Sequence, residues 1–327
     1  MAETQLNQMK RNFEWKRYPA NPIIRATPGT FFEDQSANPD LLIREHEYLL
    51  YFRGQQGGHD RIGLARADKN NFDGALWEIL SEPVIDVGMA GDPDESHALD
   101  PAAIEVNGKI FLYYSAVSPT CERSICLAIS RDGIHFEKCS KNPILIGGCP
   151  EVVCFENKFH LFYWHPRENH TGFEIHSAVS DDGINFSPLI ENPVLPVGNE
   201  NRWDSHTVET PRIFFENGIF HMIYCGSERN DDYPDQAGLA ISKDLIHWEK
   251  FSGNPIFSRG KSGDWDEGAI WFTTVEKIRG KYFLWYEGYG GGVNRDVPYD
   301  SYLRGGKSQI GLAILEAPYF YVPGRDF

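Results

Sequence analysis

The sequence lacks the features of several large classes of protein. No apolar run approaches the roughly 20 residues that a membrane-spanning helix needs. The first residues, Met1 to Leu6, have no apolar core of a signal peptide, so we expect a cytoplasmic protein, although a periplasmic or secreted location stays open. The six cysteines form no Cys-x-x-Cys pair, and we expect free thiols in a reducing compartment.

Positive charge is also scarce. The chain has 31 Lys and Arg against 47 Asp and Glu, which gives a formal net charge of −16. Nucleic acids and anionic membranes both bind basic patches, so we expect neither as a partner.

One short phrase recurs along the chain. Its clearest copy runs from His97 to Ser115 and predicts two apolar strands joined by the tight turn Asn107-Gly108, because both turn residues adopt a positive φ readily. Five copies of this hairpin are present, the fifth with a longer predicted turn, and four carry a proline at the same place: Pro39, Pro101, Pro150 and Pro211. A third short strand follows each hairpin, and in the first four units an edge strand comes next, marked by an Asn-Pro pair at Asn142, Asn192 and Asn254. The repeating unit therefore holds four strands in about 50–60 residues.

Repeated units of four antiparallel strands are typical of β-propellers. We therefore predict an all-β chain folded as a single five-bladed β-propeller domain over residues 1–327. The predicted blades are 31–85, 95–145, 146–196, 203–257 and 264–315, the last completed by 13–24. The last unit lacks its fourth strand, and Phe13-Glu14-Trp15-Lys16 is similar to His247-Trp248-Glu249-Lys250. The N-terminal strand is thus predicted to complete the last blade, which would remove an exposed sheet edge.

Carboxylates recur near the start of the first strand in all five copies. In a propeller these strands line the central axis, so their starting ends converge on one funnel. The carboxylates are Asp40, Asp100, Glu151, Glu209 and Glu267. Such a cluster suits glycoside cleavage, in which one carboxyl group stays protonated to donate to the leaving oxygen and another is ionised. Solubility and turn capping, or a structural calcium on the axis, are the alternative explanations, although no EF-hand-type loop occurs.

These repeats and acids make the chain similar to the five-bladed propeller glycosidases, the group that holds glycoside hydrolase families 32, 43, 62, 117 and 130. Family 43 uses an Asp base on blade one, a pKa-tuning Asp on blade two and a Glu acid on blade three. The resemblance assigns Asp100-Pro101 to the second of these roles. Asn38 stands where the base is expected, leaving Asp40 or Asp34, and Glu151 follows its proline instead of preceding it. The Glu-x-Pro phrase of the family 43 acid is instead found on blade four, at Glu209-Thr210-Pro211.

Family 130 resembles the chain at several of these places. It has an Asn-Pro opening (Asn38-Pro39), an arginine after the first hairpin (Arg53) and an Asp-Pro that bears the proton donor, which would be Asp100. A His/Arg/Pro cluster on blade three is similar to His165-Pro166-Arg167, in a different order. The family includes mannoside phosphorylases, in which basic groups hold inorganic phosphate.

The resemblance to family 130 leaves two uses for the basic residues. Arg53, His165 and Arg167 could hold phosphate, since arginine's planar fork suits it, or they could bind sugar hydroxyls. Hydrolases of the family use Glu carboxylates to activate water, a role open here to Glu209 and Glu267.

We therefore predict a glycoside hydrolase that uses carboxylate acid/base catalysis on an oligosaccharide or glycoside substrate, with no metal and no resident cofactor. Asp100 is the first catalytic candidate, followed by Glu209 and Glu151, then Glu267 and Asp40. The predicted substrate-binding residues are Asn38, Arg53, His97, His165, Arg167, His206 and Trp271. A phosphorylase that uses inorganic phosphate and a non-catalytic glycan-binding propeller are the alternatives. The sequence leaves the sugar, its anomer and the oligomeric state open.

Overall fold

The computed structural model describes residues 13–70, 72–167, 171–229, 233–290, 306–317 and 320. These residues form strands, turns and loops, with no α-helix among them, which confirms the all-β prediction for this part of the chain. The same ranges accordingly contain no helix with the length and apolarity to cross a membrane. None of the six cysteines forms a disulfide.

The strands pair into antiparallel groups, each of which opens with a hairpin. The first group is β2 (Gln35–Ile43), β3 (Glu47–Gln56), β4 (His59–Asp68) and β5 (Glu78–Ile79). The second is β6 (His97–Val106), β7 (Lys109–Val117), β8 (Ser124–Ser130), β9 (Glu137–Lys138) and β10 (Leu145–Ile146). The third is β11 (Gly148–Phe155), β12 (Lys158–Pro166), β13 (Phe173–Ser180) and β14 (Ser187–Pro188).

The last two groups follow the same pattern. The fourth is β15 (Thr207–Glu216), β16 (Ile219–Ser227), β17 (Gln236–Ser242), β18 (Glu249–Lys250) and β19 (Phe257–Ser258). The fifth is β20 (Ala269–Ile278), β21 (Lys281–Gly290), β22 (Lys307–Leu315) and β1 (Lys16–Arg17). A single parallel bridge between Asp60 and His97 joins the first two groups into one sheet.

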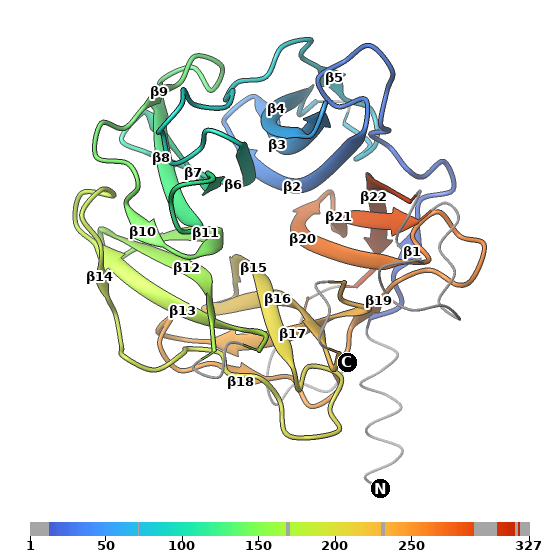
Figure 1. The fold of residues 1–327 in the computed structure, drawn as a ribbon. Helices are drawn as coiled ribbons and strands as arrows, with labels where there is room; N and C mark the ends of the chain where they lie inside the picture. Colours follow the sequence, from blue (N-terminus) through green and yellow to red (C-terminus); the bar gives the residue numbers. More distant parts are fainter. Residues whose placement is uncertain are drawn as a thin grey trace, which may run out of the picture.

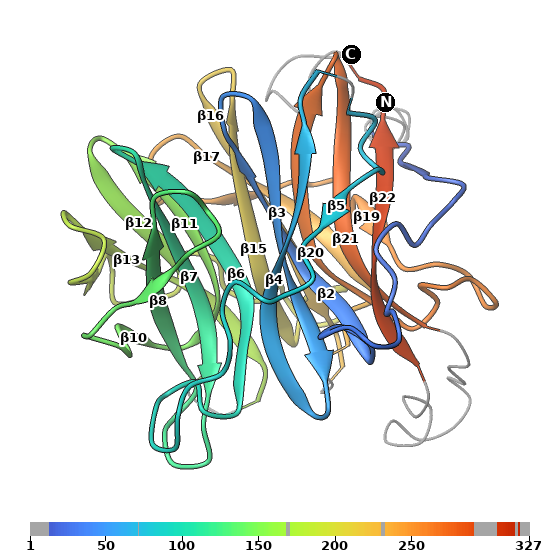
Figure 2. The same ribbon diagram turned by 90° about the horizontal axis from the view of Figure 1, so that it is seen from above.

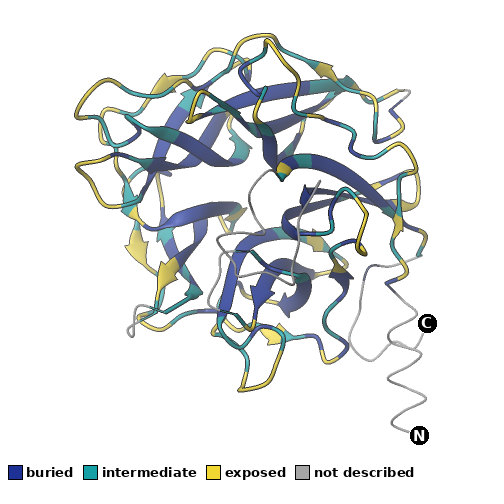
Figure 3. Ribbon diagram, turned by 45° about the vertical axis from the view of Figure 1, so that its right-hand side comes forward, coloured by how far each residue is buried: buried dark blue, intermediate teal, exposed yellow. Residues whose placement is uncertain are grey.

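The first strand of every group faces a common centre. Figure 1 shows β2, β6, β11, β15 and β20 nearest to it, with the later strands of each group farther out. Neighbouring first strands contact each other in chain order, and β20 contacts β2, so these contacts run around the whole centre. The view from above shows the strands of adjacent groups standing side by side (Figure 2). Burial follows this plan, because the inner strands are buried and the outer edges and loops are exposed (Figure 3).

The N-terminal strand completes the last group, as predicted. β1 pairs with β22 through Lys16 opposite Ile314 and Arg17 opposite Ala313. The Asn-Pro edges provide a second match: Asn21, Asn142 and Asn254 each donate to and accept from one backbone leucine of their group, which is Leu312, Leu127 and Leu239, respectively. The edge of the last group is therefore supplied by the other end of the chain.

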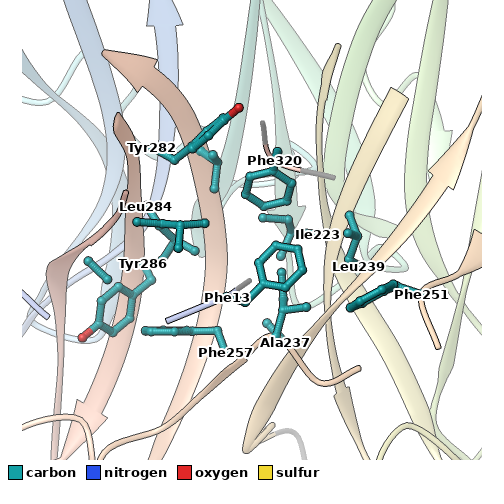
Figure 4. Packing of buried hydrophobic residues seen from close by; sticks show 14 of the residues in the cluster. Phe13, Ile223, Ala237, Leu239, Phe251, Phe257, Tyr282, Leu284, Tyr286 and Phe320 are labelled. Carbon is teal, nitrogen blue, oxygen red and sulfur yellow. The ribbon is translucent and has the colours of Figure 1, made fainter. Parts of the chain in front are cut away.

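Apolar side chains fill the space between adjacent groups. The cluster between the fourth and fifth groups includes Leu239 and Leu284, with Phe13 and Phe320 between them (Figure 4). The rings of Phe13 and Phe320 meet edge to face at 5.2 Å between centroids. The segment that precedes β1 thus packs into the core where the first and last parts of the chain meet.

Every first strand carries a bulge at the same place. The register slips after residues 37, 99, 148, 209 and 271. One residue in each bulge has a positive φ between 47° and 54°: Asn38, Asp100, Cys149, Thr210 and Phe272, called the bulge residues below. A non-glycine residue in this conformation costs on the order of 1 kcal/mol, and such residues cluster at functional sites. A bulge also changes the direction in which the side chains of a strand point. The five bulge residues therefore lie at the same place along the axis.

The fifth hairpin differs from its prediction. The sequence indicated a longer turn, but β20 and β21 are joined by the two-residue turn Arg279-Gly280, in which Arg279 takes the left-handed φ (50°) that Asn107 takes in the second group (52°). The longer-turn prediction was wrong because arginine gives no sequence signal for this conformation. As a result Phe272, and not Glu267, is the structural equivalent of Asp100.

Candidate active site

The five bulge residues line a single cavity of about 460 Å³ on the axis. Three buried carboxylates lie in its wall: Asp100, Glu209 and Glu287. Two arginines also line it, Arg53 and Arg123. Aromatic rings complete the wall, provided by Trp164, Phe173, Tyr233, Trp271, Phe272 and Tyr289. The cavity therefore combines acids, bases and flat apolar surfaces, which is the composition of a small-molecule site.

Asp100 is held by two neighbours. Its Oδ2 accepts a hydrogen bond from Nη2 of Arg123 at 2.9 Å and lies 3.4 Å from Sγ of Cys149. The indole of Trp164 donates to that sulfur at 3.0 Å and also lies beneath the Arg123 guanidinium, 5.0 Å from the ring centroid. Asp100 is only 2% exposed, so these contacts fix the orientation of its carboxylate within the cavity.

Glu287 has a different environment. Its Oε2 accepts from both the backbone N and the side-chain amide of Asn38, at 3.1 and 3.0 Å, and its Oε1 accepts from the Ser308 hydroxyl. Burial raises the pKa of Glu287, and the nearby charge of Asp100 adds to this, whereas Arg53 and the hydrogen bonds oppose it. Two carboxylates with different surroundings in one cavity suit acid/base chemistry.

Arg53 connects the cavity to Asp60 and His97, which form an ion pair next to it. Its guanidinium donates to Oε1 of Gln35 at 2.9 Å and lies 3.6 Å from Glu287 and 3.8 Å from Asp60. Nδ1 of His97 is 2.8 Å from Oδ2 of Asp60. Burial alone would raise the pKa of Asp60, but Arg53 and His97 together lower it. His97 therefore supports Arg53 through Asp60 and does not itself line the cavity.

Asp40 and Glu151 lie elsewhere. They belong to a second set of residues, two positions beyond the bulge residues on the same strands: Asp40, Ala102, Glu151, Arg212 and Thr274, called the plug residues below. Nε of Arg212 is 3.6 Å from Asp40, and its Nη1 is 3.3 Å from Glu151. Arg212 also donates to the backbone carbonyls of Pro101 and Pro150, both at 2.9 Å. These bonds tie neighbouring first strands together across the axis.

Four of the plug residues, Asp40, Glu151, Arg212 and Thr274, line a separate cavity of about 220 Å³. Backbone amides complete the shell, because Ala103 N donates to Asp40 and Ile213 N donates to Glu151, both at 2.8 Å. Burial raises the pKa of Glu151 to about 8, against the opposing effect of Arg212. The placement of Asp40 and Glu151 gives no support to a catalytic role for either, since both are engaged in this structural cluster.

Glu267 also lies outside the cavity. Its carboxylate accepts from the backbone N of Gly263 at 2.7 Å, as Glu33 does from Gly29 and Glu95 from Gly91 in other groups. Its neighbour Asp266 accepts from the Tyr286 hydroxyl at 2.9 Å, a bond repeated by Asp94 with Tyr114 and by Asp204 with Tyr224. Turn capping, the simpler alternative raised by the sequence, accounts for Glu267.

Five of the other predicted binding residues line one of two cavities. Asn38, Arg53 and Trp271 line the axial cavity, and Trp271 is 9% exposed there. His165 and Arg167 line a larger adjoining cavity of about 900 Å³, which shares Arg123 and Trp164 with the first. His206 lines neither, and its carbonyl accepts from Nη1 of Arg167 at 3.5 Å.

Sequence reasoning missed Glu287, Arg123 and Trp164. A register signal was present for two of them, because Arg53, Trp164 and Glu287 all lie on second strands, opposite the residue that precedes a bulge. Arg123 comes from the loop before β8 and had no repeat to mark it. In the ranges that the structure describes, no group of three or more His, Cys, Asp or Glu is arranged to hold a metal ion. The absence of a resident cofactor stays a prediction.

Comparison with known proteins supports a relationship to glycoside-processing propellers. The family model for glycoside hydrolase family 130, described as β-1,4-mannooligosaccharide phosphorylase, matches residues 149–310. A 1,2-β-oligomannan phosphorylase of Thermoanaerobacter sp. (strain X514) is 37% identical over 114 residues, which are 34% of this chain and 34% of that protein. The chain thus spans about a third of that relative's length in the match.

Solved structures match over nearly the whole chain. One is described as "The GH130 family of mannoside phosphorylases contains glycoside hydrolases that target beta-1,2 mannosidic linkages in Candida mannan", with a TM-score of 0.70 and 16% identity, covering 96% of this chain and 95% of that one. A thermostable family-43 glycoside hydrolase has a TM-score of 0.66 and 18% identity, covering 92% and 99%. Over residues 149–310 the chain therefore resembles glycoside hydrolase family 130 in sequence, and its fold is similar to those of solved glycoside hydrolases of families 43 and 130, as the sequence motifs predicted.

Proposed function

We propose that this protein is a glycoside-processing enzyme that cleaves a β-mannoside with inorganic phosphate. The observation that carries the proposal is that Arg53 and Arg123 line the same cavity as Asp100. The sequence placed hydrolysis first. Phosphorolysis is now the stronger candidate, because the matching family model and the phosphorylase relative are both described as acting on oligomannosides. The proposed substrate is a mannooligosaccharide, and a cytoplasmic location stays a prediction.

We also propose a domain organisation for the chain. The five strand groups are the five blades of one propeller domain over residues 1–327, with β1 as the outer strand of the last blade. The contacts that run from β2 through β6, β11, β15 and β20 back to β2 support it. Residues 1–12 and 291–305 fall within the proposed domain but outside the described residues.

Asp100 is the proposed proton donor. The proposed step starts from protonated Asp100, with phosphate bound at Arg123. Asp100 then gives its proton to the glycosidic oxygen as the bond from that oxygen to C1 breaks. A phosphate oxygen forms the new bond to C1, and the proton of the phosphate monoanion restores the Asp100 carboxyl group. The products are a sugar 1-phosphate and the shortened oligosaccharide.

The arginines supply the anion site. Guanidinium groups bind phosphate oxygens through charge-assisted hydrogen bonds in a planar fork. The Arg123 side chain is 35% exposed and that of Arg53 is 15% exposed, so both reach the cavity surface. Trp271 and Tyr289 offer apolar faces to the sugar ring. Asn38 and Glu209 are polar groups placed to bind its hydroxyls.

Hydrolysis is the second candidate, and one observation favours it. Glu209 and Glu287 give the cavity two further buried carboxylates, either of which has the chemistry to activate a water molecule. A non-catalytic glycan-binding propeller is the third, and it would hold its ligand unchanged.

The test is turnover of β-1,2- and β-1,4-linked mannooligosaccharides with and without phosphate, using wild type and Asp100→Asn. We expect product only with phosphate, appearing as mannose 1-phosphate, and a loss of about 10²–10⁴-fold in Asp100→Asn. Free mannose formed without phosphate would move the function to hydrolysis. Full activity in Asp100→Asn would overturn the role of Asp100, and binding of all substrates without turnover would favour the glycan-binding alternative.

A further inference from the structure

Cys149 is a buried thiol beside the proposed proton donor, and the chemistry described above gives it no role. It is the bulge residue of β11, and Asp100 is the bulge residue of β6. These two first strands contact each other, so the matching bulges bring both side chains to the same part of the axial cavity. Cys149 is 5% exposed, and its backbone N donates to the Ser115 hydroxyl at 2.8 Å. The backbone that carries the sulfur is therefore held in place.

The sulfur belongs to a closed ring of four side chains. The Cys149 thiol donates to Oδ2 of Asp100 at 3.4 Å, and the same oxygen accepts from Nη2 of Arg123 at 2.9 Å. The Trp164 indole donates to the sulfur at 3.0 Å, and the centroid of its ring lies 5.0 Å from the guanidinium carbon of Arg123. Trp164 thus supports both of the groups that hold Oδ2.

The two oxygens of the Asp100 carboxyl group have different surroundings. Oδ2 accepts two hydrogen bonds, whereas no residue in the described ranges donates a hydrogen bond to Oδ1. A protonated carboxyl group carries its proton on one of its oxygens, and an oxygen that already accepts two hydrogen bonds leaves little room for it. The arrangement therefore favours Oδ1 as the oxygen that carries the proton.

Arg123 and Cys149 differ as supports for Oδ2. The proposed mechanism also assigns Arg123 to phosphate, so the guanidinium serves a ligand that enters and leaves. Cys149 serves only the protein, because its thiol donates to Asp100 and its sulfur accepts from Trp164.

We propose that Cys149 is a positioning residue for the proton donor. Its thiol holds Oδ2 of Asp100 throughout the reaction and keeps the transferable proton on Oδ1, where it can pass to the glycosidic oxygen. This role deepens the proposed glycoside cleavage and rests on it. A proton that is misplaced by a fraction of an ångström is transferred more slowly, so the loss of the thiol should lower kcat.

The test asks whether Cys149 acts through Asp100. With phosphate present, kcat and KM for β-mannobiose are measured in Cys149→Ala and Cys149→Ser, because serine restores a hydrogen-bond donor at the same place. Cys149→Ala is also combined with Asp100→Asn, which completes a double-mutant cycle. The control is Cys126→Ala, since Cys126 is a fully buried thiol on β8 that lines neither the axial cavity nor the adjoining one.

We expect Cys149→Ala to lower kcat by about tenfold, with KM within about twofold of wild type. Cys149→Ser should recover kcat to within about threefold of wild type, and Cys126→Ala should leave it unchanged. In the Asp100→Asn background, Cys149→Ala should lower kcat by less than about twofold, because no transferable proton remains to be placed.

Three results would overturn the role of Cys149 and leave the proposed function intact. They are an unchanged kcat in Cys149→Ala, a kcat in Cys149→Ser as low as in Cys149→Ala, and a further tenfold loss in the Asp100→Asn background. The last two would indicate that Cys149 only fills space in the fold. Absence of turnover by wild type, with or without phosphate, would instead overturn the proposed function, and this inference with it.

Discussion

The bulge residues and the plug residues lie two positions apart on the same five strands, yet they form opposite environments. The bulge residues surround an open cavity of about 460 Å³, in which Asp100 and Glu287 face Arg123 and Arg53. Four of the plug residues line a cavity of about 220 Å³, in which Arg212 contacts Asp40, Glu151 and two backbone carbonyls. Both sets combine buried carboxylates with arginine, so composition alone does not separate a binding site from a structural tie.

The two sets differ in the other groups that contact their arginine side chains. Arg212 is 3% exposed and is surrounded by carbonyls and the Phe272 ring, so it has no surface to offer to a ligand. The side chain of Arg123 is 35% exposed, and it meets Asp100 from a loop, where an incoming anion can reach it. A ligand can therefore approach Arg123, whereas Arg212 is contacted only by other groups of the protein.

The largest effect should come from breaking the plug. Replacing Arg212 by leucine leaves the buried carboxylate of Asp40 without its positive partner, and removing one member of a buried ion pair costs about 3–5 kcal/mol. Urea unfolding should show this loss in Arg212→Leu. Arg123→Leu should lose less than this, because the Arg123 side chain is 35% exposed and solvent screens its pair with Asp100. Equal stability of the two variants would remove the distinction between the two arginines.

The second effect should appear in phosphate binding. A hydrogen bond to a charged group contributes about 1.5–3 kcal/mol, so Arg123→Gln should weaken the apparent affinity for phosphate by about 10–100-fold, measured as a rise in its KM. The control is Arg44→Gln, because Arg44 also pairs with carboxylates, Glu47 and Glu105, but lies in neither cavity. An unchanged phosphate KM in Arg123→Gln would place the anion elsewhere, with Arg53 as the next candidate.

A smaller effect should appear as a dependence of stability on pH. The folded protein keeps Glu151 protonated up to about pH 8, whereas the unfolded chain releases that proton near pH 4.5. The free energy of unfolding should therefore fall as pH rises from about 4.5 to about 8. Glu151→Gln imitates the protonated form, so its stability should fall less over this range. Parallel profiles for wild type and Glu151→Gln would mean that the plug holds Glu151 ionised.

The sequence predicted the frame of the molecule better than its site. Strand repeats, Asn-Gly turns and Asn-Pro edges are local signals, and they placed the hairpins and the pairing of β1 with β22. The five carboxylates were aligned by proximity to a strand start, but only Asp100 is a bulge residue. Asp40 and Glu151 are plug residues, and Glu209 precedes its bulge by one position. A single-residue bulge decides which side chain faces the cavity, and Phe272-Thr273 lacks the proline that marked the other four.

The smallest effect is expected at Glu267, just before β20, where the sequence prediction and the structure disagree most. Glu267 caps a turn through its bond to Gly263, so Glu267→Gln should cost about 0.5–1.5 kcal/mol of stability and leave turnover within about twofold of wild type. Glu95→Gln is the matched variant, because Glu95 makes the same bond to Gly91 in the second group and is not among the catalytic candidates. Thermal unfolding and kcat/KM are measured for both. A loss of activity of about 10²-fold or more in Glu267→Gln alone, the size expected for a lost general acid or base, would return Glu267 to the catalytic residues despite its distance from the bulge.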